Sequence, residues 1–384
     1  MLIEFKVKNY RSIKEEQILS MVKSNAKELE DTNTFTTPEK KKPIKLLSSA
    51  TIYGPNASGK SNLLKAMKTM QRLVLDSDSK IKRGKKLPIT PFLLDNDTKE
   101  KPTEFEIIFV SKEVRYQYGF ILNNELILEE WLYSFPEGPS QTWFEREYKE
   151  DKTTNWYFGS KFVGNKKIWS ESTRENALFL STAIQLNSEQ LKPVYDWFNE
   201  DFHVLESTAR LDPDFTYELY GQEKYKTLIN KFLNVADLDI EELKITEEEF
   251  DPSKLPDEIP DTLRNKIAED LKDKKLLDVA SVHKSIQGED IYFDFDEESD
   301  GTRKFLAFLG PWIDTLENGY VLVVDELHDN FHPLMVRFLI ELFHSKETNK
   351  KNAQLIFTSH ETSVMTQEIF RRDQIWFCEK KFIL

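Results

Sequence analysis

The sequence predicts an α/β fold in which a parallel sheet flanked by helices is accompanied by an antiparallel β subdomain and a helical insertion. Two continuous apolar runs, YVLVVDE (320–326) and QLIFTSH (354–360), are separated by helical stretches, as expected for strands buried on both faces of a parallel sheet. Residues 104–135 instead contain short strands that alternate apolar and polar side chains, which indicates an antiparallel sheet. Helical segments dominate residues 188–284.

Composition limits the class of protein. The chain has 384 residues, of which 39% are hydrophobic and 31% charged, as is ordinary for a globular protein. No apolar run approaches the roughly 18 residues needed to span a bilayer, and the N-terminus lacks the layout of a secretory signal, so we expect a cytoplasmic protein without membrane contact. The net charge of −14 argues against binding nucleic acid by charge alone. The single cysteine, Cys378, excludes an internal disulfide and lies in an apolar run that predicts a core position.

The chain begins with one predicted strand and reaches a glycine-containing loop through another. Residues 2–13 (LIEFKVKNYRSI) alternate apolar and polar side chains, which is the period of a half-buried strand. Residues 46–53 (LLSSATIY) form an apolar run that leads into the loop, and apolar residues recur at helical spacing from Leu63 to Val74. The order of strand, glycine loop and helix is the context that a phosphate-binding loop requires.

Changes of pattern along the chain predict three domains. Residues 1–184 contain the glycine loop and the antiparallel sheet, and residues 286–384 contain the late apolar strands. Between them, residues 185–285 are predicted to form the helical insertion, which is broken by the acidic, proline-containing stretch EEEFDPSKLPDEIPD (247–261). The insertion is too short and too broken for a long coiled-coil arm.

Residues 54–61 (GPNASGKS) satisfy the phosphate-binding pattern GxxxxGK[ST]. The glycines allow backbone N–H groups to turn towards a phosphate, and the start of the following helix adds the positive end of its dipole. We expect Lys60 to reach the β- and γ-phosphates of ATP as part of the catalytic group, and the Ser61 hydroxyl to bind Mg²⁺. The predicted nucleotide-binding residues of the loop are Gly54, Pro55, Asn56, Ala57, Ser58, Gly59, Lys60, Ser61 and Asn62.

Two adjacent carboxylates, Asp325 and Glu326, follow four apolar residues. This places them at the C-terminal end of a buried strand, where open α/β sheets bind their ligands. We expect Asp325 to hold Mg²⁺ through water and Glu326 to polarise the water that attacks the phosphate. The alternative is a solvated strand end, which the phosphate-binding pattern upstream makes the less favoured interpretation.

Another apolar strand ends at Ser359 and His360. A histidine at this point can donate a hydrogen bond to the γ-phosphate and so report hydrolysis, and we assign His360 to the catalytic group. An isolated histidine after a strand is usually structural, but three strands that end towards one site favour the functional role. Histidines without such a context, among them His203, His283 and His344, are expected at the surface or in the core.

A second predicted anion site lies in ESDGTR (298–303), where Ser299 and Gly301 begin an amphipathic helix. One ATP needs one phosphate cradle, so a second helix start of this kind fits the γ-phosphate bound by another copy of the chain. This predicts a homodimer or higher homo-oligomer with composite ATP sites. The alternative is an ordinary N-cap. We expect the acidic run 294–300 to be a solvated loop rather than a metal site.

In this order the four segments resemble the ABC-type ATPase heads of the RecF, SMC and OLD group. The phosphate loop of that group reads GPNxSGKSN, as residues 54–62 do, and its signature LSGGQ is matched in spacing by residues 298–303. The match puts Ser299 and Gly301 on the serine and the second glycine of the signature. The resemblance implies an ABC-ATPase head with ATP and Mg²⁺ as its ligands.

The opening KNYRS (8–12) is similar to the N-terminal motif of the same group. The resemblance implies that Arg11 contacts nucleotide. The residues by themselves leave open that Lys8 and Arg11 are solvated strand residues.

A closer resemblance, almost from end to end, is to the RloA-type subfamily of bacterial ATPases found beside restriction and anti-phage genes. RloA-like proteins and the related AriA of the PARIS defence system act with a separately encoded partner, often a nuclease, so the resemblance implies such an effector here. The segments that carry it are MLIEFKVKNYRSIKEEQILSM (1–21), ESDGTRKFLAFL (298–309), DELHDNFHPL (325–334) and FRRDQIWF (370–377).

The resemblance also has departures. It places His332 at the D-loop position that couples the two sites of a dimer, whereas His328 stands where relatives commonly carry an acidic residue, which predicts a D-loop that works differently. No glutamine can be placed for the loop that usually follows the first lobe's strands, so that metal contact is unassigned. The chain stops at Leu384, where such proteins usually continue, which predicts that a partner-docking tail is absent.

The favoured function is an ATPase whose ATP-bound heads pair and whose hydrolysis of ATP to ADP and phosphate releases them. The switch would control a separate effector nuclease in anti-phage defence, with a phage protein or nucleic acid as the trigger. The competing function is a RecF-like or SMC-like ATPase of DNA repair or chromosome maintenance that binds DNA directly; strong stimulation by DNA at physiological salt would favour it. A third is a nucleotide-dependent scaffold with negligible turnover.

Overall fold

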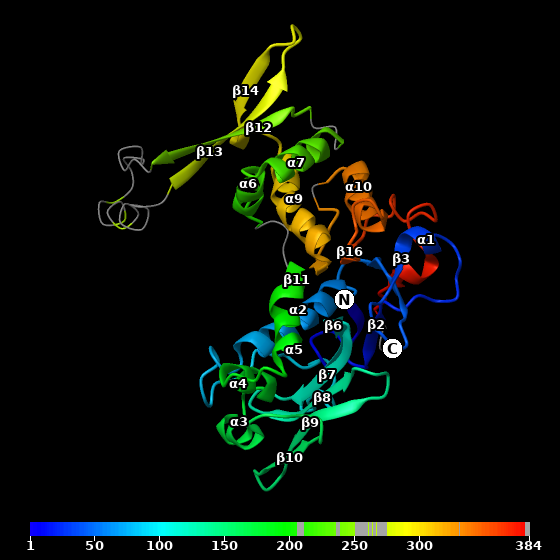
Figure 1. The fold of residues 1–384 in the computed structure, drawn as a ribbon, viewed down its shortest axis with the longest axis vertical. Coiled ribbons are helices and arrows are strands. Elements are labelled where there is room, and N and C mark those ends of the chain that lie inside the picture. The colour runs from blue at the N-terminus through cyan, green and yellow to red at the C-terminus, as the bar shows by residue number, and fades with distance from the viewer. Residues whose placement is uncertain are drawn as a thin grey trace. The chain divides into compact units, whose positions relative to one another are not determined.

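The computed structural model describes residues 1–205, 211–235, 239–249, 260, 263, 266, 275–329 and 331–380. The chain divides into two compact units (Figure 1): unit 1 comprises Met1–Thr208 and Asp314–Leu384, and unit 2 comprises Ala209–Ile313. The predicted boundaries after residues 184 and 285 differ from this division. The segment that follows residue 184 belongs to unit 1 because it adds strand β11 (Phe202–Leu205) to the parallel sheet.

Unit 1 contains a five-stranded sheet in the order β11-β15-β16-β5-β17, and all four of its strand pairs are parallel. Every residue of β5, β15 and β16 is buried, because these strands are continuous apolar runs covered on both faces. Helix α2 (Lys60–Asp76) packs against β11, and helix α10 (Pro333–His344) packs against β5 and β16. The predicted parallel sheet is confirmed. The other strands are β5 (Ser49–Tyr53), β15 (Val321–Val324), β16 (Gln354–Ser359) and β17 (Ile375–Phe377).

A seven-stranded antiparallel sheet forms the second layer of unit 1, in the order β10-β9-β8-β7-β6-β1-β2. The predicted aromatic cross-strand pairing is present: Phe105 lies opposite Phe120, with ring centroids 5.6 Å apart. The predicted antiparallel subdomain is therefore confirmed, and the N-terminal strand is part of it. The strands are β1 (Leu2–Lys8), β2 (Gln17–Ser20), β6 (Thr103–Ser111), β7 (Val114–Leu122), β8 (Ile127–Phe135), β9 (Gln141–Tyr148) and β10 (Thr154–Phe158).

Aromatic side chains fill the core of unit 1. Trp197 is fully buried and stacks on Phe109 and Phe202, with ring centroids 4.1 and 5.0 Å away. Trp197 begins a single π-helical turn (Trp197–Asp201) that leads directly into β11. The stacked rings thus join the antiparallel sheet to the start of the parallel one.

A buried ion pair lies in the same unit. The Arg146 Nε atom is 3.2 Å from Glu130 Oε2, and both side chains are almost completely buried. Glu130 also accepts hydrogen bonds from the backbone N–H groups of Phe179 and Leu180, at 2.7 and 3.1 Å, and from the Tyr118 hydroxyl at 2.9 Å. These four partners satisfy a carboxylate that would otherwise be costly to bury.

Unit 2 combines helices with a three-stranded antiparallel sheet in the order β12-β13-β14. The prediction that residues 185–285 are a helical insertion is wrong where β12 and β13 lie. In β12 (ELKITEEE) the acidic residues obscure a short apolar alternation, Leu243 and Ile245, which pairs with β13 rather than forming a helical stripe. Residues 250–259 of the broken stretch lie outside the described residues. The elements are α6 (Asp214–Tyr220), α7 (Glu223–Val235), β12 (Glu242–Glu249), β13 (Lys275–Lys284), β14 (Asp290–Asp294) and α9 (Asp300–Asn318), whose residues after Ile313 are counted with unit 1.

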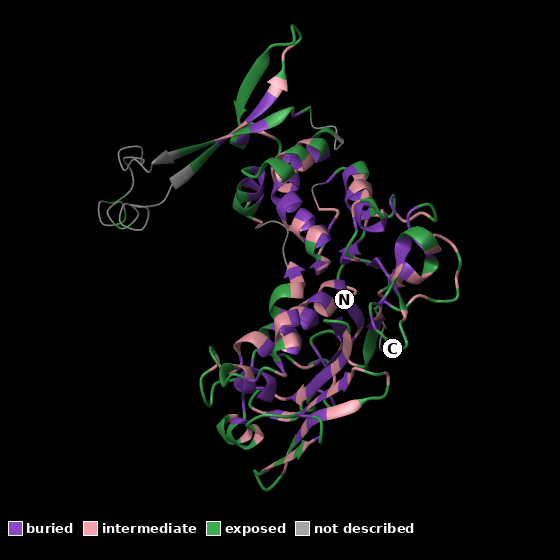
Figure 2. Ribbon diagram, viewed as in Figure 1, coloured by how far each residue is buried: buried purple, intermediate pink, exposed green. Residues whose placement is uncertain are grey.

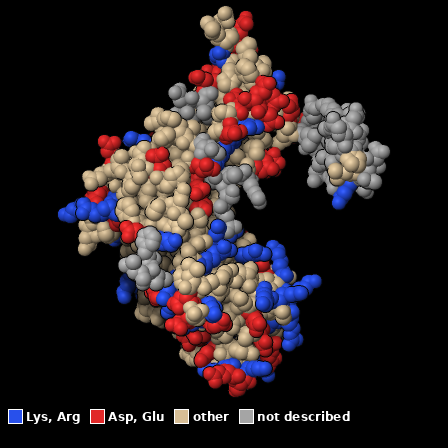
Figure 3. Space-filling view, turned by 180° about the vertical axis from the view of Figure 1, so that it is seen from behind, with Lys and Arg blue, Asp and Glu red and all other residues tan. Residues whose placement is uncertain are grey.

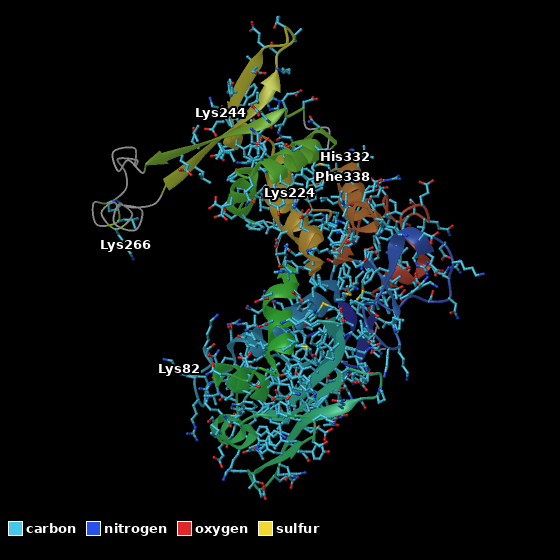
Figure 4. The ribbon with its side chains drawn as sticks, in the orientation of Figure 1. Lys82, Lys224, Lys244, Lys266, His332 and Phe338 are labelled. Carbon is cyan, nitrogen blue, oxygen red and sulfur yellow. The ribbon has the colours of Figure 1, made fainter. Side chains whose placement is uncertain are left out.

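Strand β14 is exposed along its whole length (Figure 2). Its three central side chains, Ile291, Tyr292 and Phe293, are 40%, 55% and 42% exposed. The ammonium group of Lys244, which is labelled in Figure 4, lies 4.9 Å from the centre of the Tyr292 ring. Among the described strands β14 pairs with β13 alone, so one backbone edge is left open.

Helix α9 carries the predicted amphipathic face and contains Pro311. The hydroxyl of Thr216 is inserted into the helix beside this proline: it accepts a hydrogen bond from the Gly310 N–H at 2.9 Å and donates one to the Leu306 carbonyl at 2.8 Å. A side-chain bridge of this kind replaces the direct bond between residues four apart. The buried side chains of the helix include Phe305, Phe308, Leu309, Trp312 and Leu316.

Acidic and basic side chains are interspersed over the surface seen in Figure 3, and Asp and Glu gather around the sheet of unit 2. Within the part of the chain that is described, no helix is both long and apolar enough to cross a bilayer. The shorter elements of unit 1 complete the fold: α1 (Glu30–Asn33), β3 (Thr34–Thr36), β4 (Lys45–Leu47), α3 (Lys166–Ser172), α4 (Phe179–Gln185) and α5 (Lys192–Asp196).

Candidate nucleotide-binding site

The glycine loop connects the C-terminal end of β5 to the start of α2, as the sequence predicts. Residues 55–57 are exposed, and Ala57 and Gly59 have positive φ angles of 61° and 107°. The left-handed Gly59 is the N-cap of the 17-residue helix α2. The N-terminus of α2 therefore points at the loop, and the N-terminus of a long helix attracts anions.

A close contact with backbone requires the first glycine of the pattern, and the left-handed conformation at φ 107° favours the second. A Cβ atom at Gly54 would lie 2.3 Å from the carbonyl oxygen of Cys378, and one at Gly59 would lie 2.9 Å from the Ser12 hydroxyl. Cys378 is half-buried against the core and also touches the loop, because its thiol donates to the Ser58 carbonyl at 3.1 Å. The apolar run around Cys378 predicts a core position, but it does not predict the contact between the thiol and the phosphate loop.

Lys60 is buried and its ammonium group is directed back into the loop. The Nζ atom donates to the carbonyl oxygens of Gly54 and Pro55, at 2.6 and 3.1 Å. Only 6% of the residue is exposed. A buried ammonium group held by neutral carbonyls gains more from an anionic partner, which makes it a suitable contact for phosphate.

The structure brings Ser61 and Asp325 together although they lie 264 positions apart in the sequence. The Ser61 hydroxyl donates to Asp325 Oδ1 at 3.1 Å. One hydroxyl and one carboxylate oxygen form the kind of donor set that Mg²⁺ accepts when water and phosphate supply the remaining ligands. The residues present therefore fit the predicted magnesium ion.

Thr358 links the two predicted carboxylates and was missed from the sequence. Its hydroxyl donates to Asp325 Oδ1 at 2.6 Å and accepts the Glu326 backbone N–H at 2.7 Å. Glu326 is exposed and has a φ angle of 52°, which is rare and strained for a residue with a side chain. The sharp turn after β15 thus sets the position of the Glu326 backbone, and the hydrogen bond to Thr358 holds the backbone in that position.

His360 is exposed beyond the end of β16 and pairs with His328, which follows β15. Their Nε2 atoms are 3.1 Å apart, and Ser359 Oγ lies 3.2 Å from His328 Nδ1. Burial, with His360 beside it, lowers the pKa of His328 to about 4. The sequence singled out both histidines but could not show that they touch.

Arg11 is exposed in the loop after β1 and has a φ angle of 49°. Its Nε atom donates to the Tyr10 hydroxyl at 3.1 Å. The neighbouring Ser12 is the residue of this segment that reaches the phosphate loop, because it accepts a hydrogen bond from Asn62 Nδ2 at 2.7 Å. The side chain of Asn62, predicted to bind nucleotide, therefore also anchors the N-terminal segment.

His332, labelled in Figure 4, is exposed at the N-cap of α10. Its Nδ1 atom accepts a hydrogen bond from the Leu334 N–H at 3.3 Å. Pro333 at the first helical position suits a helix start, since it lacks the N–H group that would be unpaired there. Residue 330 of the predicted D-loop lies outside the described residues.

In unit 2, Ser299 is exposed and caps helix α9. Its hydroxyl accepts the Thr302 N–H at 3.1 Å and contacts the Thr302 hydroxyl at 2.8 Å, and Gly301 lies in the first turn. Ser299 caps the helix and the helix start is also exposed, so rotation of the Ser299 hydroxyl would free the Thr302 N–H for an anion.

The residue before the cap fastens the start of α9 to the sheet of unit 2. Glu298 Oε1 lies 2.7 Å from His283 Nε2 and 2.5 Å from the Ser281 hydroxyl, and both partners belong to β13. From the sequence, His283 is expected only to be a surface or core residue. In the acidic run 294–300, Phe295 is buried in a turn of 3₁₀ helix, and among the described residues no three His, Cys, Asp or Glu side chains gather as a metal site.

Residues 49–366 match the family described as "AAA domain, putative AbiEii toxin, Type IV TA system". The chain belongs to this family. The matched region begins at β5, contains the phosphate loop and both predicted carboxylates, and ends after His360. No curated protein matches the chain.

Two solved structures are similar over most of their length. The recombination mediator protein RecF with ATP is 17% identical, with 94% of each chain covered and a TM-score of 0.34. The SMC head domain of Pyrococcus furiosus, bound to the C-terminal domain of ScpA, is 14% identical, with 95% of this chain and 91% of that chain covered and a TM-score of 0.33.

Proposed function

We propose that this protein is an ABC-type ATPase that binds Mg²⁺-ATP in unit 1 and hydrolyses it. The observation that carries the proposal is the 3.1 Å contact between Ser61, at the start of α2, and Asp325, at the end of β15. Membership of an AAA-domain family supports it. A phosphate cradle and a carboxylate that meet at the carboxyl ends of parallel strands form the arrangement used for phosphoryl transfer.

Each residue of the site has a distinct task in this proposal. The loop N–H groups and Lys60 hold the β- and γ-phosphates, and Ser61 and Asp325 hold Mg²⁺, which would neutralise charge on the phosphates. Glu326 takes a proton from the attacking water. The oxygen of that water bonds to the γ-phosphorus while the bond between the γ-phosphorus and the β–γ bridging oxygen breaks. His360 donates a hydrogen bond to the γ-phosphate.

The proposal extends to an assembly of identical chains. Ser299 is exposed at the start of a 19-residue helix, which suits it to a phosphate presented by a second copy. We therefore propose composite sites in which Ser299 and Gly301 of one subunit close the phosphate loop of another. ATP would favour the paired state and hydrolysis would release it.

Two substitutions test the chemistry. Lys60→Ala should abolish nucleotide binding, measured by titration with a fluorescent ATP analogue, because the phosphate loses its buried cation. Glu326→Gln should bind ATP normally, slow turnover by roughly 10²-fold or more and enrich dimers in light scattering. Lys82→Ala and Glu347→Gln, at exposed residues of other loops, are the matched controls. Normal turnover in Glu326→Gln would remove the role of that residue.

We further propose that the ATPase is the sensor of an anti-phage system that controls a separately encoded effector nuclease. The resemblance to RloA-like proteins and the family description, which names a putative abortive-infection toxin, support this role. Cells that carry the gene with its neighbours should lose phage protection in plating assays when Lys60→Ala is introduced. Undiminished protection, together with strong stimulation of the ATPase by duplex DNA, would instead favour a repair function.

A further inference from the structure

Two histidines from different loops form a pair, and the proposed mechanism uses only one of them. His328 follows β15 and His360 follows β16, and their rings are nearly perpendicular, at 75°, with centroids 3.8 Å apart. The Nε2 atoms are 3.1 Å apart, which is hydrogen-bond distance. A hydrogen bond between these two nitrogens requires a proton on one of them and a lone pair on the other.

The neutral state of His328 follows from its surroundings. The residue is half-buried, and the groups that act on it from the neighbouring elements are His360 and Lys60, which oppose a positive charge, and Asp329 and Glu361, which favour one. Burial is the largest influence, and it disfavours the charged ring. At neutral pH His328 therefore carries a single proton, on one of its two nitrogens.

The contacts of Ser359 favour one of the two nitrogens. Its hydroxyl oxygen accepts the Glu361 N–H at 3.0 Å, so its own proton is free to be donated. Two acceptors are available: His328 Nδ1 at 3.2 Å and the Glu361 carbonyl at 3.5 Å, which is at the limit of a hydrogen bond. Donation along the shorter of these two contacts, to His328 Nδ1, leaves the proton of His328 on Nε2. That proton is donated to His360 Nε2, and the proton of His360 then lies on Nδ1.

We propose that His328 is a positioning residue that fixes the orientation and the tautomer of His360 through the chain from Ser359. It leaves the Nδ1–H of His360 as the donor that can reach a γ-phosphate. The catalytic value of this arrangement rests on the function proposed above, but the tautomer itself does not. His328 acts through another residue, and no contact of its own with substrate is required.

The tautomer is measured directly by ¹⁵N NMR of the nucleotide-free, full-length protein labelled at histidine. The chain has six histidines, so single substitutions assign each ring. We expect the wild-type His360 signal to show a protonated Nδ1, and His328→Ala to convert it to a mixture of tautomers. His328→Gln, whose amide can still donate to His360 Nε2, should keep the wild-type signal. His203→Ala, in strand β11, should leave it unchanged.

Turnover provides the second measurement. In His328→Ala we expect kcat to fall about tenfold with KM for ATP unchanged, because losing one ordinary hydrogen bond changes a population by about that factor. His328→Gln should recover most of the rate.

A protonated Nε2 in wild-type His360, or identical His360 signals in wild type and His328→Ala, would overturn the tautomer assignment. A shifted tautomer with an unchanged kcat would overturn the positioning role. If the signals behave as expected while even the wild type fails to hydrolyse ATP, the assignment stands and the proposed ATPase function fails.

Discussion

Thr358→Val is the substitution that tests most sharply how the carboxylates of the site are held. Valine keeps the shape of threonine and removes only the hydroxyl, which here donates to Asp325 at 2.6 Å and accepts from the Glu326 N–H at 2.7 Å. Thr358 itself is fully buried. Neither bond can be replaced by a rotation of the new side chain.

The magnitude follows from these two bonds. A hydrogen bond to an ionised carboxylate contributes about 1.5–3 kcal/mol, and leaving a buried donor unpaired costs about 1–3 kcal/mol. The Glu326 N–H is only partly buried, so water can replace part of what it loses. We therefore expect the free energy of unfolding to fall by about 2–3 kcal/mol. Turnover should fall roughly 10- to 100-fold, because a displacement of about 1 Å at a reacting group has that effect.

Urea unfolding followed by tryptophan fluorescence is a suitable assay, because six of the seven tryptophans belong to unit 1. Thr51→Val is the matched control. Thr51 is also fully buried and lies in the neighbouring strand, opposite Phe357, but among the described residues its hydroxyl has no hydrogen-bond partner. It should be neutral or slightly stabilising. Equal stability and turnover in Thr358→Val and Thr51→Val would refute the reasoning.

Three further substitutions have defined outcomes. Gly54→Ala should abolish binding of a fluorescent ATP analogue, because the new methyl group would lie 2.3 Å from the carbonyl oxygen of Cys378; normal affinity would show that the loop can move aside. Arg146→Ala should lower the free energy of unfolding by about 3–5 kcal/mol in the urea assay, since it leaves Glu130 charged and buried; a loss below about 1 kcal/mol would contradict this. Burial lowers the pKa of His344 to about 3, so the unfolded chain binds a proton that the folded chain does not, and stability should fall as the pH drops from about 6.5 towards 3. His344→Gln should flatten that slope in urea unfolding at several pH values, and an unchanged slope would exclude His344 as its source.

The parts of the site that the sequence predicts are those set by local sterics and by strand ends. Gly54 and Gly59 are separated by the spacing of a phosphate loop, and the structure shows that a side chain would clash with backbone at Gly54 and would be strained at Gly59. Asp325 follows an apolar run, so its place at the end of a parallel strand follows from the pattern. The convergence of Ser61 and Asp325 is then a consequence of sheet topology.

The parts that the sequence does not predict depend on contacts between distant segments. Ser12 and Thr358 are polar residues of common types, and only the folded chain shows that one meets the loop and the other joins two carboxylates. Strand β12 was missed for a different reason. Its run of glutamates resembles a solvated helix, whereas pairing with β13 is a tertiary effect that overrides local propensity.

The open backbone edge of β14 has a consequence for handling the protein in concentrated solution. If two copies joined these edges about a two-fold axis, with Tyr292 facing its counterpart, Asp290 of each would face Asp294 of the other. Like charges directly opposite one another repel. The aspartates at both ends of β14 therefore disfavour pairing of two such edges and the fibre-like growth that pairing could begin. Salt screens such repulsion, so the purified protein should be concentrated at low ionic strength.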